Sequence, residues 1–181
     1  TMVGGTGDDT YVVDSSSDVV TESSSEGTDL IEASVSYTAA ANVENLTLTG
    51  SGNLNATGNA LANTLTGNSG ANRLIGGEAN DTLTGLTGAD QFQLGDGSDQ
   101  VTDFSIPQGD RVGIQHGLSY TISQAASDLL ISVASVGSIL LQSINESDFD
   151  ADTQIVRTDA SGNPGPAPAP SPSPGPSPSP G

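Results

Sequence analysis

Large apolar side chains recur at every ninth residue between residues 58 and 102. This stretch divides without remainder into five nonamers: GNALANTLT, GNSGANRLI, GGEANDTLT, GLTGADQFQ and LGDGSDQVT. In each nonamer the eighth residue is large and apolar, and its neighbours at positions seven and nine are nearly always polar. This alternation predicts a three-residue strand with an inward central side chain, preceded by a six-residue glycine-rich turn. The inward residues are Leu65, Leu74, Leu83, Phe92 and Val101.

The same period appears near the N-terminus. GGTGDDTYV (4–12) and VDSSSDVVT (13–21) follow each other in phase, and SSEGTDLIE (24–32) resumes the pattern after two additional residues. Tyr11, Val20 and Ile31 then take the inward position. Residues 33–57 alternate less regularly, and we expect them to form an irregular stretch of the same solenoid.

The pattern changes after residue 102. TDFSIPQGDRVGI leads to three strand-like runs, SYTISQ, DLLISVA and SILLQS, which we expect to form a small antiparallel cap on the end of the solenoid. Nine of the ten prolines then fall in 163–181, which predicts an extended, semi-rigid spacer. Four segments are therefore expected: N-terminal repeats and irregular strands (1–57), the regular nonapeptide array (58–114), a strand cap (115–160) and a Pro/Ser/Gly-rich linker (161–181).

The charge of the chain restricts its partners. Asp and Glu number 22 against three basic residues, which gives a formal net charge of -19. This balance argues against binding to nucleic acid or to an anionic membrane, and no apolar run is long enough to insert into a bilayer. The chain has no Cys, and its one His is His116, so disulfides and a His-rich zinc cluster are excluded. Many carboxylates and 23 Gly remain, which suits a hard cation bound by oxygen.

Position six of the nonamers carries most of the acids that are candidate side-chain ligands. Each nonamer buries a single large side chain, which is little compensation for ordering nine residues, and the clustered acids repel one another. Calcium would neutralise these acids and link successive turns, so binding and folding are expected to be coupled. The alternative is that the acids only form turns on a solvated edge. The sixth residues are Asn63, Asn72, Asp81, Asp90 and Asp99 in the array, and Asp9, Asp18 and Asp29 upstream.

GGTGDDTYV and the five-nonamer array resemble the hemolysin-type calcium-binding repeats of the RTX family. TDFSIPQGDRVGI and the strands after it are similar to the segment that ends such arrays in secreted serralysin-like proteins. The resemblance implies an all-β, right-handed parallel β-roll with two nonamers per coil and calcium ions between turns eighteen residues apart. It also implies secretion from a bacterium, with type I export.

The resemblance further implies the ligands. In the family, the earlier turn supplies carbonyls at positions two and four with the Asp at six, and the later turn supplies carbonyls at one and three with its own Asp. Carried onto this sequence, Gly77, Ala79 and Asp81 face Leu94, Asp96 and Asp99; Asn68, Gly70 and Asn72 face Gly85, Thr87 and Asp90; Asn59, Leu61 and Asn63 face Gly76, Glu78 and Asp81; Leu86, Gly88 and Asp90 face Asp103 and Asp110; and Gly5, Gly7 and Asp9 face Ser24, Glu26 and Asp29. Asn in place of Asp removes a charge and is expected to weaken the ion.

No catalytic motif stands out. H-E-x-x-H and G-x-S-x-G are both missing, so the segment is expected not to be an enzyme. Three alternatives for the whole protein stay open: a noncatalytic C-terminal region of a secreted hydrolase (metalloprotease, lipase or glycanase), part of an adhesin or surface-layer protein, or an ice-binding solenoid. The last rests on outward threonines at Thr64, Thr66, Thr82, Thr84 and Thr102. We expect an extracellular module, linked covalently to neighbouring modules in a longer chain.

Overall fold

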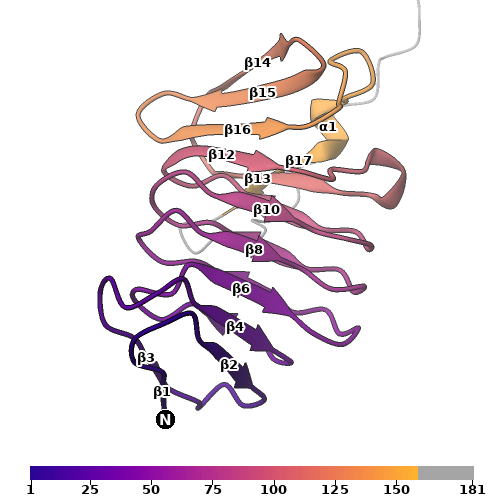
Figure 1. Ribbon diagram of the computed structural model, residues 1–181. Helices are drawn as coiled ribbons and strands as arrows, with labels where there is room; N and C mark the ends of the chain where they lie inside the picture. Colours follow the sequence, from indigo (N-terminus) through magenta and orange to yellow (C-terminus); the bar gives the residue numbers. More distant parts are fainter. Residues whose placement is uncertain (159–181) are drawn as a thin grey trace, which may run out of the picture.

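The computed structural model describes residues 1–158, and the expected linker at 161–181 lies outside the described residues. The chain winds into a β-solenoid in which two long sheets of mostly parallel strands enclose one apolar core (Figure 1). The all-β parallel solenoid expected from the nonamer period is confirmed.

One sheet has nine strands and the other has six. In spatial order the nine-stranded sheet contains β14 (Tyr120–Ala125), β15 (Asp128–Val133), β16 (Gly137–Leu141), β12 (Gly97–Val101), β10 (Thr82–Thr84), β8 (Thr64–Thr66), β6 (Asn45–Leu48), β4 (Leu30–Ala33) and β2 (Thr10–Val13). The six-stranded sheet contains β17 (Ile155–Thr158), β13 (Arg111–Gln115), β11 (Gln91–Gln93), β9 (Arg73–Ile75), β7 (Asn55–Thr57) and β5 (Tyr37–Thr38). β1 (Met2–Val3) pairs with β3 (Val20–Thr21), and short helical turns lie at Ile106–Gln108 (η1) and Ala151–Gln154 (α1).

The strand register reproduces the sequence period. β8 aligns with β10 so that Leu65 pairs with Leu83, and β9 aligns with β11 so that Leu74 pairs with Phe92, in both cases eighteen residues later. Two nonamers therefore make one coil. Outside the array the coil length changes: Leu30 pairs with Asn45 after fifteen residues, and Gln91 pairs with Arg111 after twenty.

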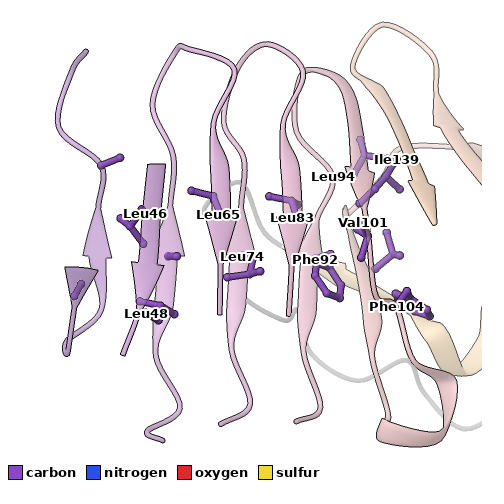
Figure 2. Close-up of a cluster of buried hydrophobic side chains, with 14 of the residues drawn as sticks. Leu46, Leu48, Leu65, Leu74, Leu83, Phe92, Leu94, Val101, Phe104 and Ile139 are labelled. Atoms are coloured by element: carbon purple, nitrogen blue, oxygen red, sulfur yellow. The ribbon is translucent and has the colours of Figure 1, made fainter. Parts of the chain in front are cut away.

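Each nonamer contributes its eighth residue to the core. Leu65, Leu74, Leu83, Phe92 and Val101 are all fully buried and follow one another along the solenoid axis (Figure 2). Residues from the irregular stretch, Leu46 and Leu48 among them, continue the same column. The inward orientation predicted for position eight is thus confirmed.

The expected antiparallel cap is confirmed, and two of the C-terminal strands also join the solenoid. β14, β15 and β16 pair antiparallel as expected, but β16 also pairs in parallel with β12, and β17 pairs in parallel with β13. The chain therefore completes another coil, from which the β14–β15 hairpin protrudes as an insertion. Phe104 supports this end, with ring centroids 6.0 Å from both Phe92 and Phe149.

The N-terminal coil accommodates its two additional residues without losing register. β2 and β4 pair in parallel, with Tyr11 opposite Ile31 after twenty residues. The residues in excess of the nonamer period are Glu22 and Ser23, directly after β3. They enlarge the turn and leave the strands aligned.

Candidate metal centres

The turns between strands form two rows along the solenoid. The first row leads into the nine-stranded sheet and includes the turns 4–9, 24–29, 58–63, 76–81 and 94–99. The second row leads into the six-stranded sheet and includes the turns 67–72, 85–90 and 103–110. Position six is the last residue of each turn, so its side chains stack on one another from coil to coil.

In the first row, Asp81 and Asp99 are each only 2% exposed. Asp81 Oδ1 accepts a hydrogen bond from the Asn63 amide at 2.8 Å, and Asp99 Oδ1 accepts one from the Asp81 amide at 3.1 Å. The Oδ2 atoms of both residues are buried and have no hydrogen-bond partner. Buried oxygens left without a donor are costly, so these two positions favour a cation.

The second row repeats this arrangement at Asp90 but not at Asp110, whose Oδ2 accepts a hydrogen bond from the Ser105 amide at 2.8 Å. Asp90 Oδ1 accepts from the Asn72 amide at 2.7 Å, while its Oδ2 is buried without a partner. Asp110 takes the place of the next position-six residue, since its Oδ1 accepts from the Asp90 amide at 2.8 Å. Asp103 lies further out in the turn and accepts from the amides of Gly85 at 2.9 Å and Leu86 at 2.7 Å. Asp103 therefore caps the neighbouring turn through both of its carboxylate oxygens.

Burial shifts the acidities of these carboxyls. Desolvation raises the pKa of Asp99 to about 7 and that of Asp90 to about 6, and it also raises the pKa values of Asp81 and Asp110. Hydrogen bonds from the backbone of the preceding coil oppose the shift in every case. Without an ion, this arrangement disfavours the charged forms of its own acids.

Backbone carbonyls converge on the same spaces. Gly77 (φ +114°) and Ala79 (φ +68°) adopt the left-handed region, and their carbonyls are directed at the next turn of the row. A Cβ on Gly95 would lie 2.6 Å from the Gly77 oxygen, and one on Gly97 would overlap the Ala79 oxygen. Glycine on the later turn thus keeps open a cradle lined by carbonyl oxygens.

Where position six of the array is Asn, its side chain makes different hydrogen bonds from those of Asp. The Asn63 side-chain amide donates to the carbonyls of Val43 at 3.0 Å and Glu44 at 3.1 Å. The Asn72 amide donates to the Leu54 carbonyl at 3.2 Å. At both positions the side-chain amide donates to the preceding coil, whereas the Asp residues accept a hydrogen bond from that coil through Oδ1.

The other expected ligands occupy the same turns. Asn59 and Asn68 form local turns by accepting from the amides of Leu61 and Gly70, both at 2.8 Å. The following expected ligands have exposed side chains, so that only their carbonyls could enter a site: Leu61, Glu78, Leu86, Thr87 and Asp96. Leu94 is buried, Gly76 and Gly85 pack under the Oδ2 atoms of Asp81 and Asp90, and Gly88 faces the Gly70 carbonyl.

The N-terminal coil also brings expected residues together. Asp29 Oδ1 accepts from the Asp9 amide at 2.9 Å, and the Oδ2 atoms of both residues are buried without partners. The Glu26 backbone carbonyl lies opposite Gly7 and accepts a hydrogen bond from the Gly7 amide. Gly5 has φ +96°, in the left-handed region. Among residues 1–158, no hydrogen bond joins Ser24 to Asp9 or Asp29.

The sequence analysis did not identify two acidic residues, because neither stands at position six of a nonamer. Glu44 occupies the equivalent place in the fifteen-residue coil and accepts from the Asp29 amide at 2.9 Å. Glu22 belongs to the two-residue insertion and joins Asp9 and Asp29, with one carboxylate oxygen from each lying within 4.8 Å of the others. The insertion itself was the available signal for Glu22.

The atoms in both rows that could bind a metal are oxygens, from carboxylates and backbone carbonyls, which suits a hard cation such as calcium. The Asp81–Asp99 pair and the Asp9–Asp29 pair both fit this ion, because each places two buried carboxylate oxygens without partners on successive turns. Within the described residues 1–158, no helix is long and apolar enough to cross a membrane.

Comparison with known proteins gives the same identification. Residues 57–92 and 66–101 match the RTX calcium-binding nonapeptide repeat, which comprises four copies. A relative, the endo-1,3-1,4-β-glycanase ExsH of Rhizobium meliloti, is 50% identical over 70 residues, which are 39% of this chain and 15% of that protein. The chain therefore spans only a small part of the relative's length. The nonamers of residues 57–101 are RTX calcium-binding repeats, and Ca²⁺ is their ion.

Proposed function

We propose that calcium ions bound between stacked turns couple ion binding to the folding of this module. The observation that carries the proposal is the row of buried position-six carboxylates, each with one oxygen satisfied by the preceding coil and the other without a partner. A cation between two turns would satisfy both of the free oxygens and join the coils. RTX repeats are calcium-binding sequences, which supports the choice of ion.

The strongest site uses Asp81 and Asp99 with the carbonyls of Gly77, Ala79, Leu94 and Asp96. In the second row, Asp90 shares one ion with the turn 67–72 and another with Asp110. The site between the turns 58–63 and 76–81 has one carboxylate fewer, because Asn63 stands opposite Asp81. We expect that site, and the one at Asn72, to bind calcium more weakly.

Coupling to folding follows from the cost of the metal-free state. In that state each buried acid must either take up a proton or stay charged without a partner, and both options destabilise the roll at neutral pH. The unfolded chain lacks assembled sites, so calcium stabilises the folded state by mass action. With dissociation constants of about 0.1 mM and calcium near 1 mM, each site adds roughly 1.4 kcal/mol.

This coupling suits a secreted bacterial protein. At low cytosolic calcium the chain would stay unfolded, which favours passage through an export channel, and it would fold at extracellular calcium concentrations. We propose that the module is noncatalytic and belongs to a longer extracellular protein. A secreted glycanase is a specific candidate for that protein, since the 70 matching residues of the relative belong to an enzyme so named.

Circular dichroism during a calcium titration tests the proposal, with magnesium as the control ion. We expect the 181-residue chain to gain most of its strand signal from calcium and little from magnesium. The variant D81A/D99A should raise the calcium midpoint about tenfold or more, because it removes both carboxylates of the strongest site. A full strand signal in chelator that calcium does not change would contradict the proposal.

A further inference from the structure

We propose that Glu22, a residue of the two-residue insertion, is a third carboxylate ligand of a calcium ion bound by Asp9 and Asp29 in the N-terminal coil, outside the matched repeats of residues 57–101. This inference rests on the proposed function. One carboxylate oxygen of each lies within 4.8 Å of those of the other two. Asp29 is 1% exposed and Glu22 is 7% exposed. The Oδ2 atoms of Asp9 and Asp29 are buried without hydrogen-bond partners, so the cluster contains free oxygens that point away from solvent.

Glu22 distinguishes this site from a pair of regular nonamers. The regular period needs no residue between Thr21 and Ser24, and the insertion places Glu22 at the entrance of the turn 24–29. Glu22 Oε1 accepts from the Ser23 amide at 3.0 Å, and Oε2 accepts from the Tyr11 hydroxyl. These two donors hold the third carboxylate next to Asp9 and Asp29.

The first 72 residues, which contain the cluster, include no basic side chain. All three basic residues, Arg73, Arg111 and Arg157, come later in the sequence. Three neighbouring carboxylates repel one another unless a cation lies between them. The Tyr11 pKa is raised to about 12 by its burial and by Glu22, so its hydroxyl is a neutral donor and adds no charge.

The donors favour calcium over other divalent ions. The cluster contains carboxylate oxygens and no nitrogen or sulfur donors, which excludes a typical zinc site. Carboxylates of unequal reach, from two Asp and one Glu, suit the variable coordination of calcium better than the strict octahedron of magnesium. An ion here would link β2 to β4 at the N-terminal end of the solenoid.

Terbium luminescence tests this site selectively in the 181-residue chain, because a nearby tyrosine sensitises a bound lanthanide. The chain has no Trp, and the Tyr11 hydroxyl contacts a proposed ligand directly. We expect sensitised emission that calcium displaces and that Y11F abolishes, while calorimetry shows an unchanged number of calcium ions for Y11F. E22Q should weaken terbium binding about tenfold or more, since it removes one of three charged ligands.

The matched control is E26Q, which removes the same charge from the same turn. The Glu26 side chain does not belong to the cluster, so the terbium affinity of E26Q should stay within about twofold of that of the wild type. D81N should leave the Tyr11 signal in place, which separates this site from the array sites of the proposed function. The proposal is overturned if E22Q and E26Q have equal effects, or if Y11F retains the emission.

Discussion

The early and late turns of the array stack on their neighbours by different chemistry. Asn63 and Asn72 donate their side-chain amides to carbonyls of the preceding coil. Asp81 and Asp99 occupy the same position one and two coils later, and each has a buried oxygen without a partner. Asn and Asp have nearly the same shape, so the backbone can stay the same while the need for an ion changes.

This difference suggests a division of labour along the solenoid. The coils that contain Asn complete their hydrogen bonds internally, so they can form without calcium once a neighbour is present. The coils that contain Asp place charged groups in a poorly solvated space and depend on an ion to neutralise them. The calcium dependence of the whole module should therefore arise mainly at the Asp turns, and exchange of the two residue types tests this directly.

The largest effect is expected for D81N/D99N. Two buried carboxylates become neutral amides, the group that Asn63 already places at the same position one coil before Asp81. We expect the metal-free fold to gain about 2–4 kcal/mol and the calcium-induced gain to shrink by a similar amount. Urea unfolding with and without calcium measures both quantities. A variant that stays as calcium-dependent as the wild type would show that Asn and Asp turns do not differ in this way.

The reverse exchange, N63D, should act in the opposite direction with a smaller effect. It replaces the donor to the Val43 and Glu44 carbonyls by a buried carboxylate. We expect a loss of about 1–3 kcal/mol in chelator, which calcium largely restores because a second acid now faces Asp81.

The control for N63D is N80D, which adds the same charge at an exposed position. The Asn80 side chain already acts only as an acceptor, from the Ser98 amide at 2.8 Å, and Asp can keep that bond. Its stability should change by less than about 0.5 kcal/mol. Equal losses in N63D and N80D would indicate general charge repulsion and not a local need for the amide.

The stability of the metal-free fold should fall as pH rises. The pKa values of Asp90 and Asp99 in the folded state, about 6 and about 7, lie above those of carboxyls in an unfolded chain, about 3.9. Between these values the folded state keeps protons that the unfolded state has released, so stability declines from about pH 4 to about pH 7. Strand content in metal-stripped buffer should thus be greater at pH 5 than at pH 8.

Calcium should reverse this trend, because it binds the deprotonated carboxylates. D99N should remove the part of the decline between pH 6 and pH 7 that belongs to Asp99. If metal-free strand content instead increases with pH, the buried acids are not protonated in the fold. The turns that contain Asn do not titrate, and they would then have to explain how both the early and the late coils of the array stack.

The nonamer period was sufficient to predict a repeat fold and its inward side chains, and the resemblance to RTX repeats implied the eighteen-residue coil. In such a coil each inward residue meets its equivalent one coil later, as Leu65 meets Leu83. The coils outside the array were harder to predict, because turns of different length can restore the same strand register. Thus β6 follows β4 after fifteen residues, and β16 follows β12 after forty.

Site residues outside position six could not be found from the period. Glu22 and Glu44 reach the first row of turns only because an insertion and a short coil place them there. The sequence also did not reveal that the Asn side-chain amides donate hydrogen bonds. It shows that Asn in place of Asp removes a charge, but it does not show which backbone carbonyls accept from the amide. Strand-like character identified SILLQS, yet nothing in that run distinguishes parallel stacking on β12 from a separate antiparallel cap.

The smallest effect is expected for D96N, in the same turn as Asp99. The Asp96 side chain is exposed, and its proposed role uses the backbone carbonyl, which the substitution preserves. We expect the calcium midpoint to change by less than about twofold, because an exposed charge is screened by salt. A shift as large as that of D99N would place the Asp96 carboxylate in the site. Calcium dependence would then reflect the total acidity of the turn, and the contrast between buried Asp and buried Asn would lose its explanatory role.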